Sequence, residues 1–178
     1  MKRNSIFYLI VFAFASCVVE EPDLSRYTIS PIENVEEARD VEVTYTDSSR
    51  LVFILKAPLS RRQIEKFSTE EIFPEGIDVT FYDRYGTPRS WLKADYAIRD
   101  QVSRTIIVQK NVILENDQGE RLEAPELIWD EKTKEIYTDR FVKHTREDRV
   151  IYSYGFKSNE SFTHYELHAV SGSMVKEE

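Results

Sequence analysis

Ile77-Asp78-Val79-Thr80-Phe81-Tyr82 and Trp91-Leu92-Lys93-Ala94-Asp95-Tyr96-Ala97-Ile98 decide the fold of this 178-residue chain. Apolar and polar residues alternate in both stretches, which is typical of a β-strand with one face in water. The chain has 10 Tyr and 10 Phe but only 5 Gly, a composition that favours strands. The sequence therefore predicts an all-β protein, and the second stretch places four side chains on one face: Leu92, Ala94, Tyr96 and Ile98.

Upstream of these stretches the sequence predicts a β-hairpin. Val41–Thr46 alternates, Asp47-Ser48-Ser49 supplies a turn, and Leu51–Leu55 returns. The segment Leu59–Glu71 lacks this alternation and carries apolar residues at helical spacing for only one turn. It is interpreted as a loop with a short helix.

The second half of the chain contains an internal repeat. Leu92–Ile98 recurs thirty residues later as Leu122–Ile128, and Ile106–Val112 recurs at the same interval as Ile136–Val142. A third, more divergent copy runs from Ile151 to Val170. Each copy is a two-strand unit that cannot bury its apolar face alone, so stacked copies must create the core. The expected architecture is a partly open β-jelly roll, a folded antiparallel sheet or "β-taco" built from repeated two-strand units.

The N-terminus predicts export and a lipid anchor. Lys2 and Arg3 precede a short apolar run, Ile6–Phe14, and then Ala15-Ser16-Cys17. The run is too short to span a bilayer, which takes about 20 residues. The ending resembles a bacterial lipobox, in which Cys17 would carry the lipid; the alternative is an incidental thiol in a signal peptide cut elsewhere. The expected organisation is a lipoprotein signal peptide over 1–17, a flexible linker over 18–40 and a β-domain over 41–178.

Composition and motifs argue against several functions. The formal net charge is −8 and no basic cluster is present, which disfavours a nucleic-acid binder. His164 and His168 lie in an alternating segment, and four residues along a strand span about 13 Å, too far to share a metal ion easily. The sequence holds no phosphate-binding glycine loop and no nucleophile elbow. We therefore expect neither an enzyme nor a cofactor or metal site.

The inward-facing apolar residues have two interpretations. They form either a closed core or the lining of a groove between two sheets that binds an apolar ligand. The candidate groove residues are Val79, Phe81, Leu92, Tyr96, Val108, Val112, Leu127, Trp129, Val142, Phe156 and Leu167.

From Phe73 onward the sequence resembles the lipopolysaccharide export family LptC. The resemblance rests on the order of Phe73–Asp83 with Gly86, Leu92–Ala97, Asn111–Asn116, Gly119–Leu122, Glu126–Asp130, Gly155-Phe156 and Phe162–Gly172. It implies an apolar interior that holds the acyl chains of lipopolysaccharide. It also implies that the cargo comes from an inner-membrane ABC transporter and goes to a periplasmic, LptA-like bridge protein. Many members of the family keep a transmembrane helix where this chain carries the lipobox, so the expected location is lipid-anchored on the periplasmic side of the envelope, at the inner membrane.

The partners are expected at unpaired strand edges, which recruit other strands. We expect the hairpin Val41–Ile54 to pair with the transporter and the closing strand Phe162–Val170 to pair with the bridge protein. The edge residues are Val41, Val43, Tyr45 and Phe53 at one end and Phe162, Tyr165, Leu167 and Val170 at the other. Two other functions stay open: a lipid-anchored structural or adhesive β-domain with a closed core, and a hydrolase whose acids or histidines converge only in three dimensions.

Overall fold

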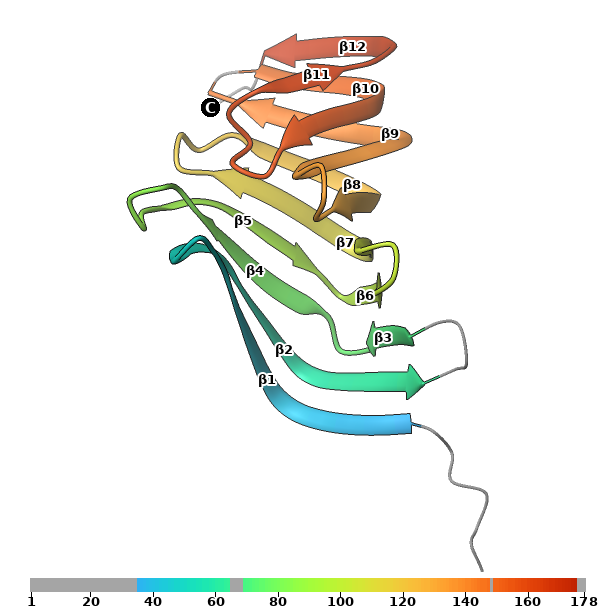
Figure 1. The fold of residues 1–178 in the computed structure, drawn as a ribbon. Coiled ribbons are helices and arrows are strands. Elements are labelled where there is room, and N and C mark those ends of the chain that lie inside the picture. The colour runs from blue at the N-terminus through green and yellow to red at the C-terminus, as the bar shows by residue number, and fades with distance from the viewer. Residues whose placement is uncertain (1–34, 65–68, 148, 176–178) are drawn as a thin grey trace, which may run out of the picture. The chain divides into compact units, whose positions relative to one another are not determined.

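The computed structural model describes residues 35–64, 69–147 and 149–175, which all belong to one compact unit. They form a 12-stranded antiparallel sheet, and this part of the chain contains no helix (Figure 1). The all-β prediction is confirmed. The strands are β1 (Val35–Asp47), β2 (Arg50–Ile64), β3 (Thr69–Phe73), β4 (Ile77–Tyr82), β5 (Pro88–Ala94), β6 (Tyr96–Asp100), β7 (Thr105–Asn116), β8 (Arg121–Asp130), β9 (Glu135–Arg146), β10 (Arg149–Asn159), β11 (Tyr165–Leu167) and β12 (Val170–Val175).

Two boundaries differ from the expectation. β1 begins at Val35, so residues 35–40 are strand rather than linker; the signal peptide, Cys17 and residues 18–34 lie outside the described residues. In the segment interpreted as a loop with a helix, the described residues 59–64 and 69–71 are strand, because β2 continues to Ile64 and β3 pairs with it.

The sheet is folded because the six long strands β1, β2, β7, β8, β9 and β10 bend in the middle and contribute to two walls. In wall 1, the first half of β7 pairs with β6, and β6 pairs with β3. In wall 2, the second half of β7 pairs with β5, and β5 pairs with β4. Each bent strand forms a V-shaped unit with one arm in each wall, and each unit runs antiparallel to the next (Figure 1). In three of the units the bend interrupts the strand, so that the two arms are separate strands: β3–β4, β5–β6 and β11–β12.

Backbone conformations that reverse the pleat produce these bends. Gly76, between β3 and β4, has φ +88°, and Gly155 in β10 has φ +89°. In β7 the bend uses Lys110 and Asn111, with φ of +64° and +50°. A Cβ on Gly76 would lie 2.3 Å from the carbonyl oxygen of Ala94, so only glycine allows β4 and β5 to approach this closely at the bend.

The bends also change which residues face inward. Phe73, Ala97, Val108 and Leu127 pair across wall 1 and are all at most 1% exposed, so they form one inward-facing row. Ala97 rather than Tyr96 therefore continues the inner face begun by Leu92. The prediction that Tyr96 and Ile98 share the face of Leu92 is wrong, because the break at Asp95 shifts the alternation by one residue.

The internal repeat has a structural counterpart. In β7 and β9, four positions that lie thirty residues apart are buried in both strands, two before the bend and two after it. They are Ile106, Val108, Val112 and Leu114 in β7, and Ile136, Thr138, Val142 and His144 in β9. The repeat thus encodes the bent strand itself, including the interruption between the two alternating halves.

Candidate ligand-binding interior

The inward-facing side chains of the two walls meet and fill the space between them. Nine of the predicted groove residues are at most 2% exposed: Val79, Phe81, Leu92, Val108, Val112, Leu127, Trp129, Val142 and Phe156. Leu167 is half-buried, and Tyr96 lies on the outer face, where Lys110 approaches its ring. Nine of the eleven predicted residues thus face the interior, and ligand binding by them stays a prediction.

Trp129 holds the walls together at the centre of this interior. Its ring, from wall 1, lies 4.8 Å from the rings of both Phe53 and Phe81, which belong to wall 2. Both contacts are edge-to-face, an arrangement that contributes about 0.5–1.5 kcal/mol beyond burial. Its indole N–H donates to Glu160 Oε1 at 2.9 Å, so the one polar atom of the ring is also satisfied.

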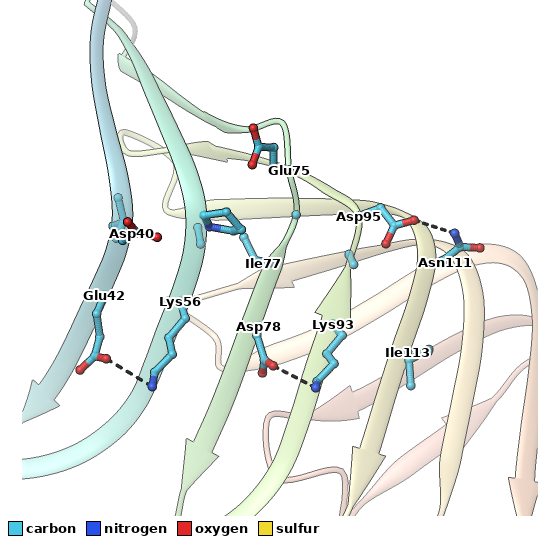
Figure 2. Close-up of a pocket in the computed structure, with 15 residues that line it drawn as sticks. Asp40, Glu42, Lys56, Glu75, Ile77, Asp78, Lys93, Asp95, Asn111 and Ile113 are labelled. Carbon is cyan, nitrogen blue, oxygen red and sulfur yellow. Dashed lines mark hydrogen bonds and ion pairs between the residues drawn. The ribbon is translucent and has the colours of Figure 1, made fainter.

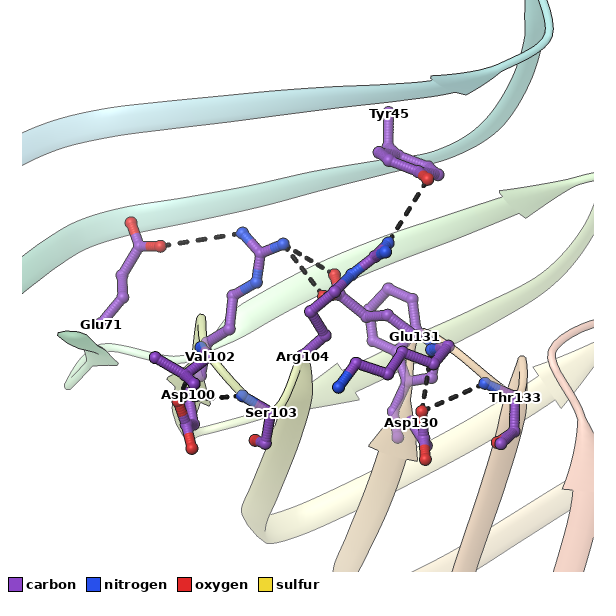
Figure 3. A network of polar contacts seen from close by, with 12 residues as sticks. Tyr45, Glu71, Asp100, Val102, Ser103, Arg104, Asp130, Glu131 and Thr133 are labelled. Carbon is purple, nitrogen blue, oxygen red and sulfur yellow. Dashed lines mark hydrogen bonds and ion pairs between the residues drawn. The ribbon is translucent and has the colours of Figure 1, made fainter. Parts of the chain in front are cut away.

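Near the N-terminal end, wall 1 carries charge on its inner side (Figure 3). Arg99 donates to both carboxylate oxygens of Glu131, at 2.8 and 3.0 Å, and its other terminal nitrogen lies 3.9 Å from Glu71. Glu71 and Glu131 are 5% and 7% exposed, and buried carboxylates need such partners. The sequence did not predict this network: Glu71 and Arg99 are charged residues at inward positions of strands, and Glu131 lies in a turn.

Arg104 extends the network across to wall 2. One of its terminal nitrogens donates to the Tyr45 hydroxyl over 3.4 Å, and this hydrogen bond raises the pKa of Arg104. A second contact between the walls is the ion pair of Lys134 Nζ with Asp47 Oδ2, at 3.6 Å. Polar contacts between turn residues of wall 1 and the end of β1 thus join the free ends of the two walls.

The C-terminal end of the interior is aromatic. His144 in β9 is fully buried, its ring packs against Phe162 and Tyr165, and neither ring nitrogen has a hydrogen-bond partner. Burial is the main cause of a lowered His144 pKa; Glu120 opposes the shift and Arg146 adds to it. His144 is thus a neutral member of the aromatic cluster.

The outermost strands leave one edge unpaired at each end of the described sheet. β1 pairs only with β2, and the β11–β12 unit pairs only with β10. Val41, Val43 and Tyr45 are half-buried along β1. Tyr165 and Leu167 in β11 are also half-buried, while Val170 in β12 is 57% exposed.

Two predicted edge residues are not at an edge. Phe53 lies in β2, which has β1 on one side and β4 on the other, and it is 3% exposed. Phe162 lies in the turn before β11 and is fully buried. The alternation over Phe162–His168 predicted one strand, whereas only Tyr165–Leu167 forms β11, because Phe162 and Ala169 have positive φ.

A sequence model described as "Lipopolysaccharide-assembly, LptC-related" matches residues 54–174 of the chain. The chain belongs to this family. The resemblance inferred from the sequence is thereby confirmed at the level of the domain. LptC-related proteins are components of lipopolysaccharide transport in the cell envelope and not enzymes. A comparison with curated proteins found no match.

The LptC-related domain also has a hollow on the outer side of its bend, with a cavity volume of about 670 Å³ (Figure 2). Ala57, Pro58 and Ile77 contribute apolar surface to it. The cations that line it are neutralised: Lys56 lies 3.4 Å from Glu42 and Lys93 lies 2.9 Å from Asp78. Lys56 and Lys93 alternate with the buried Leu55 and Leu92, so they lie on the outer face, whereas Ala57 and Ile77 belong both to the hollow and to the core.

Neither histidine near the C-terminus joins a metal site. His164 Nδ1 lies 3.0 Å from Thr163 Oγ1, and His168 Nε2 lies 3.5 Å from Glu166. Across 35–64, 69–147 and 149–175, no group of three or more His, Cys, Asp or Glu side chains could hold a metal ion. Among the same residues, no helix is long and apolar enough to cross a membrane.

Proposed function

We propose that this chain is a lipid-anchored periplasmic component of lipopolysaccharide export. It accepts the acyl chains of lipopolysaccharide between its walls from an inner-membrane ABC transporter and passes them to an LptA-like bridge protein. The observation that carries the proposal is the apolar interior shared by two walls whose free ends, in the described part of the chain, are joined by side-chain contacts such as Arg104–Tyr45 and Lys134–Asp47. Such an interior can shield hydrocarbon from water, a gain of about 0.8 kcal/mol for each CH₂.

Loading requires the walls to separate. The contacts of Trp129 with Phe53 and Phe81 are apolar, so an acyl chain that enters between them replaces one set of apolar contacts with another. The exchange therefore changes the free energy little. The direction of transport then comes from ATP use by the transporter, and this domain performs no covalent chemistry.

The two edges serve different partners in this proposal. The β1 edge, with Val41, Val43 and Tyr45, pairs with the transporter, and the β11–β12 edge pairs with the bridge protein. Because each V-shaped unit belongs to both walls, a partner that adds one such unit extends both walls at once and continues the interior. Pairing of backbone groups along the edge would supply the affinity.

The anchor is the lipid on Cys17, and the residues that follow it provide reach. The family match supports an envelope location, and the short apolar run before Cys17 supports export and lipidation. Replacing Cys17 by serine should release the protein from membranes in a fractionation assay. Membrane retention of that variant would contradict the anchor.

Cross-linking tests the cargo site. A photo-reactive residue at Phe81 or Leu127, both at most 2% exposed and inward-facing, should capture lipopolysaccharide in cells. The same residue at Lys93 or Tyr96, on the outer face, should not. Equal capture at all four positions would contradict an interior site.

One observation favours the alternative, a structural or adhesive β-domain: the interior is already filled by the chain's own side chains. A fluorescent fatty-acyl probe decides between the two functions. A carrier should bind the probe and release it when lipopolysaccharide is added. A domain with a permanently closed core should bind neither the probe nor lipopolysaccharide.

A further inference from the structure

Phe162 fills part of the interior from a turn. Its side chain is fully buried, and its ring centroid lies 5.6 Å from Phe156, 5.7 Å from His144 and 5.4 Å from Tyr165. Residues 160–164, which we call the strap, take no part in the strand pairings of β10 with β11. The backbone pairing between β10 and β11 therefore does not involve Phe162, whose side chain fills space between the walls.

Polar contacts from both walls hold the strap in place. The Ser90 hydroxyl in β5 donates to the carbonyl oxygen of Glu160, and Asn116 Nδ2 at the end of β7 donates to that of Phe162 at 2.9 Å. From the opposite wall, Trp129 donates to the Glu160 carboxylate. The net contribution of one such hydrogen bond is modest, so each changes the closed–open equilibrium by only about two- to tenfold.

The closed strap also carries unfavourable features. Phe162 has φ +50°, a left-handed conformation that is costly for a bulky residue. Burial raises the pKa of the Glu160 carboxyl, which means that its charged form would gain by returning to water. Burial of the Phe162 ring is thus the main favourable contribution, and another apolar group in the same place could supply it.

We propose that the strap is a displaceable plug, and that Phe162 occupies a subsite for one acyl chain of the cargo. Loading expels Phe162 to solvent, and unloading lets it return, so that the emptied interior is not filled by water. This inference rests on the proposed function and adds the place where the cargo and the chain itself compete. The apparent affinity for an acyl chain then depends on the fraction of molecules whose strap is open.

Hydrogen exchange on the unaltered full chain tests the plug directly. In the closed state the Phe162 amide donates to the Asn159 carbonyl oxygen at 3.0 Å, and those of Thr163 and His164 donate to Asn159 Oδ1 at 3.0 and 3.1 Å. Adding lipopolysaccharide should make these three amides exchange faster while those of β7 keep their protection. If these three amides exchange no faster with lipopolysaccharide bound, the plug is overturned, whatever affinities the variants below show.

Two variants give an independent measurement with the fluorescent acyl probe. Ser90→Ala removes one bond that holds the strap and leaves the interior filled, so it should raise affinity about two- to tenfold. Phe162→Ala empties the subsite and should raise affinity more than tenfold, provided that circular dichroism shows it folded. Val102→Ala, at a turn position that is 66% exposed, is the matched control and should leave affinity unchanged.

The outcomes separate the two proposals. Probe and lipopolysaccharide binding by the unaltered protein, with no gain in Ser90→Ala or Phe162→Ala, overturns the plug and leaves the carrier function in place. Absence of binding in the unaltered protein and in both variants overturns the carrier function and the plug with it. Binding by Phe162→Ala alone supports the plug.

Discussion

Replacing Gly76 by alanine should destabilise the domain by about 2–5 kcal/mol, and the structure separates this cost into two parts. A left-handed conformation costs an L-residue about 1–2 kcal/mol, and Gly76 has φ +88°. The new methyl group would also lie 2.3 Å from the carbonyl oxygen of Ala94, so β4 and β5 must move apart at the bend. Overpacking of this kind adds about 1–3 kcal/mol.

Gly86 provides the matched control, because it has φ +81° but no atom within 4 Å of an added Cβ. Gly86→Ala should therefore lose only the conformational part, about 1–2 kcal/mol. Urea unfolding followed by tryptophan fluorescence measures both variants, and Gly76→Ala should unfold at the lower urea concentration. Equal losses in the two variants would refute the claim that close approach at the bend, rather than backbone conformation alone, requires Gly76.

Four further outcomes follow from the interior and the surface. Trp129→Ala should cost about 3–5 kcal/mol in the same unfolding assay, since it removes the contact between the walls. The pKa of His144 is lower in the folded state than in the unfolded chain, so the unfolded chain takes up a proton at a higher pH. The free energy of unfolding should therefore fall as the pH drops below about 6.5, and His144→Leu should reduce this pH dependence. The folded state raises the pKa of Glu160, so stability should fall as the pH rises above about 4.5, and Glu160→Gln should remove that slope. Lys93→Ala breaks an exposed pair with Asp78 and should cost no more than about 1 kcal/mol, a difference that 1 M salt should abolish.

Alternation and repetition predicted much of the fold. The strand Ile77–Tyr82 shows a buried residue at every second position, as its sequence pattern indicates. The thirty-residue repeat predicted stacked two-strand units, and β7 and β9 indeed bury equivalent positions. These features are local, so they could be read without knowledge of the tertiary contacts.

The bends could not be predicted in the same way. A residue with positive φ shifts or interrupts the alternation; Lys110 has no sequence feature that announces it, and Asn111 has only a residue type that adopts this conformation more readily than most. At Asp95 a bend without positive φ separates β5 from β6, and the local alternation therefore predicted the wrong face for Tyr96. The apparent strand through Phe162 failed for a related reason: its apolar residue is buried by a turn that folds back between the walls, a long-range contact absent from any local pattern.

The two ends of the interior differ chemically, and this difference bears on the proposed passage of cargo. At the β1 end, Glu71, Arg99 and Glu131 place buried charge on wall 1 opposite the aromatic side chain of Tyr45. At the β12 end, the lining is aromatic and contains Phe162. A cargo with an anionic head group and apolar chains would meet guanidinium groups first and hydrocarbon-binding surface afterwards. Because the Arg99 charge is already neutralised by Glu131, contact with such a head group would require rearrangement of that ion pair within wall 1. Arg104, which lies 3.9 Å from Glu131 and donates to the Tyr45 hydroxyl, is the residue that connects this pair to wall 2.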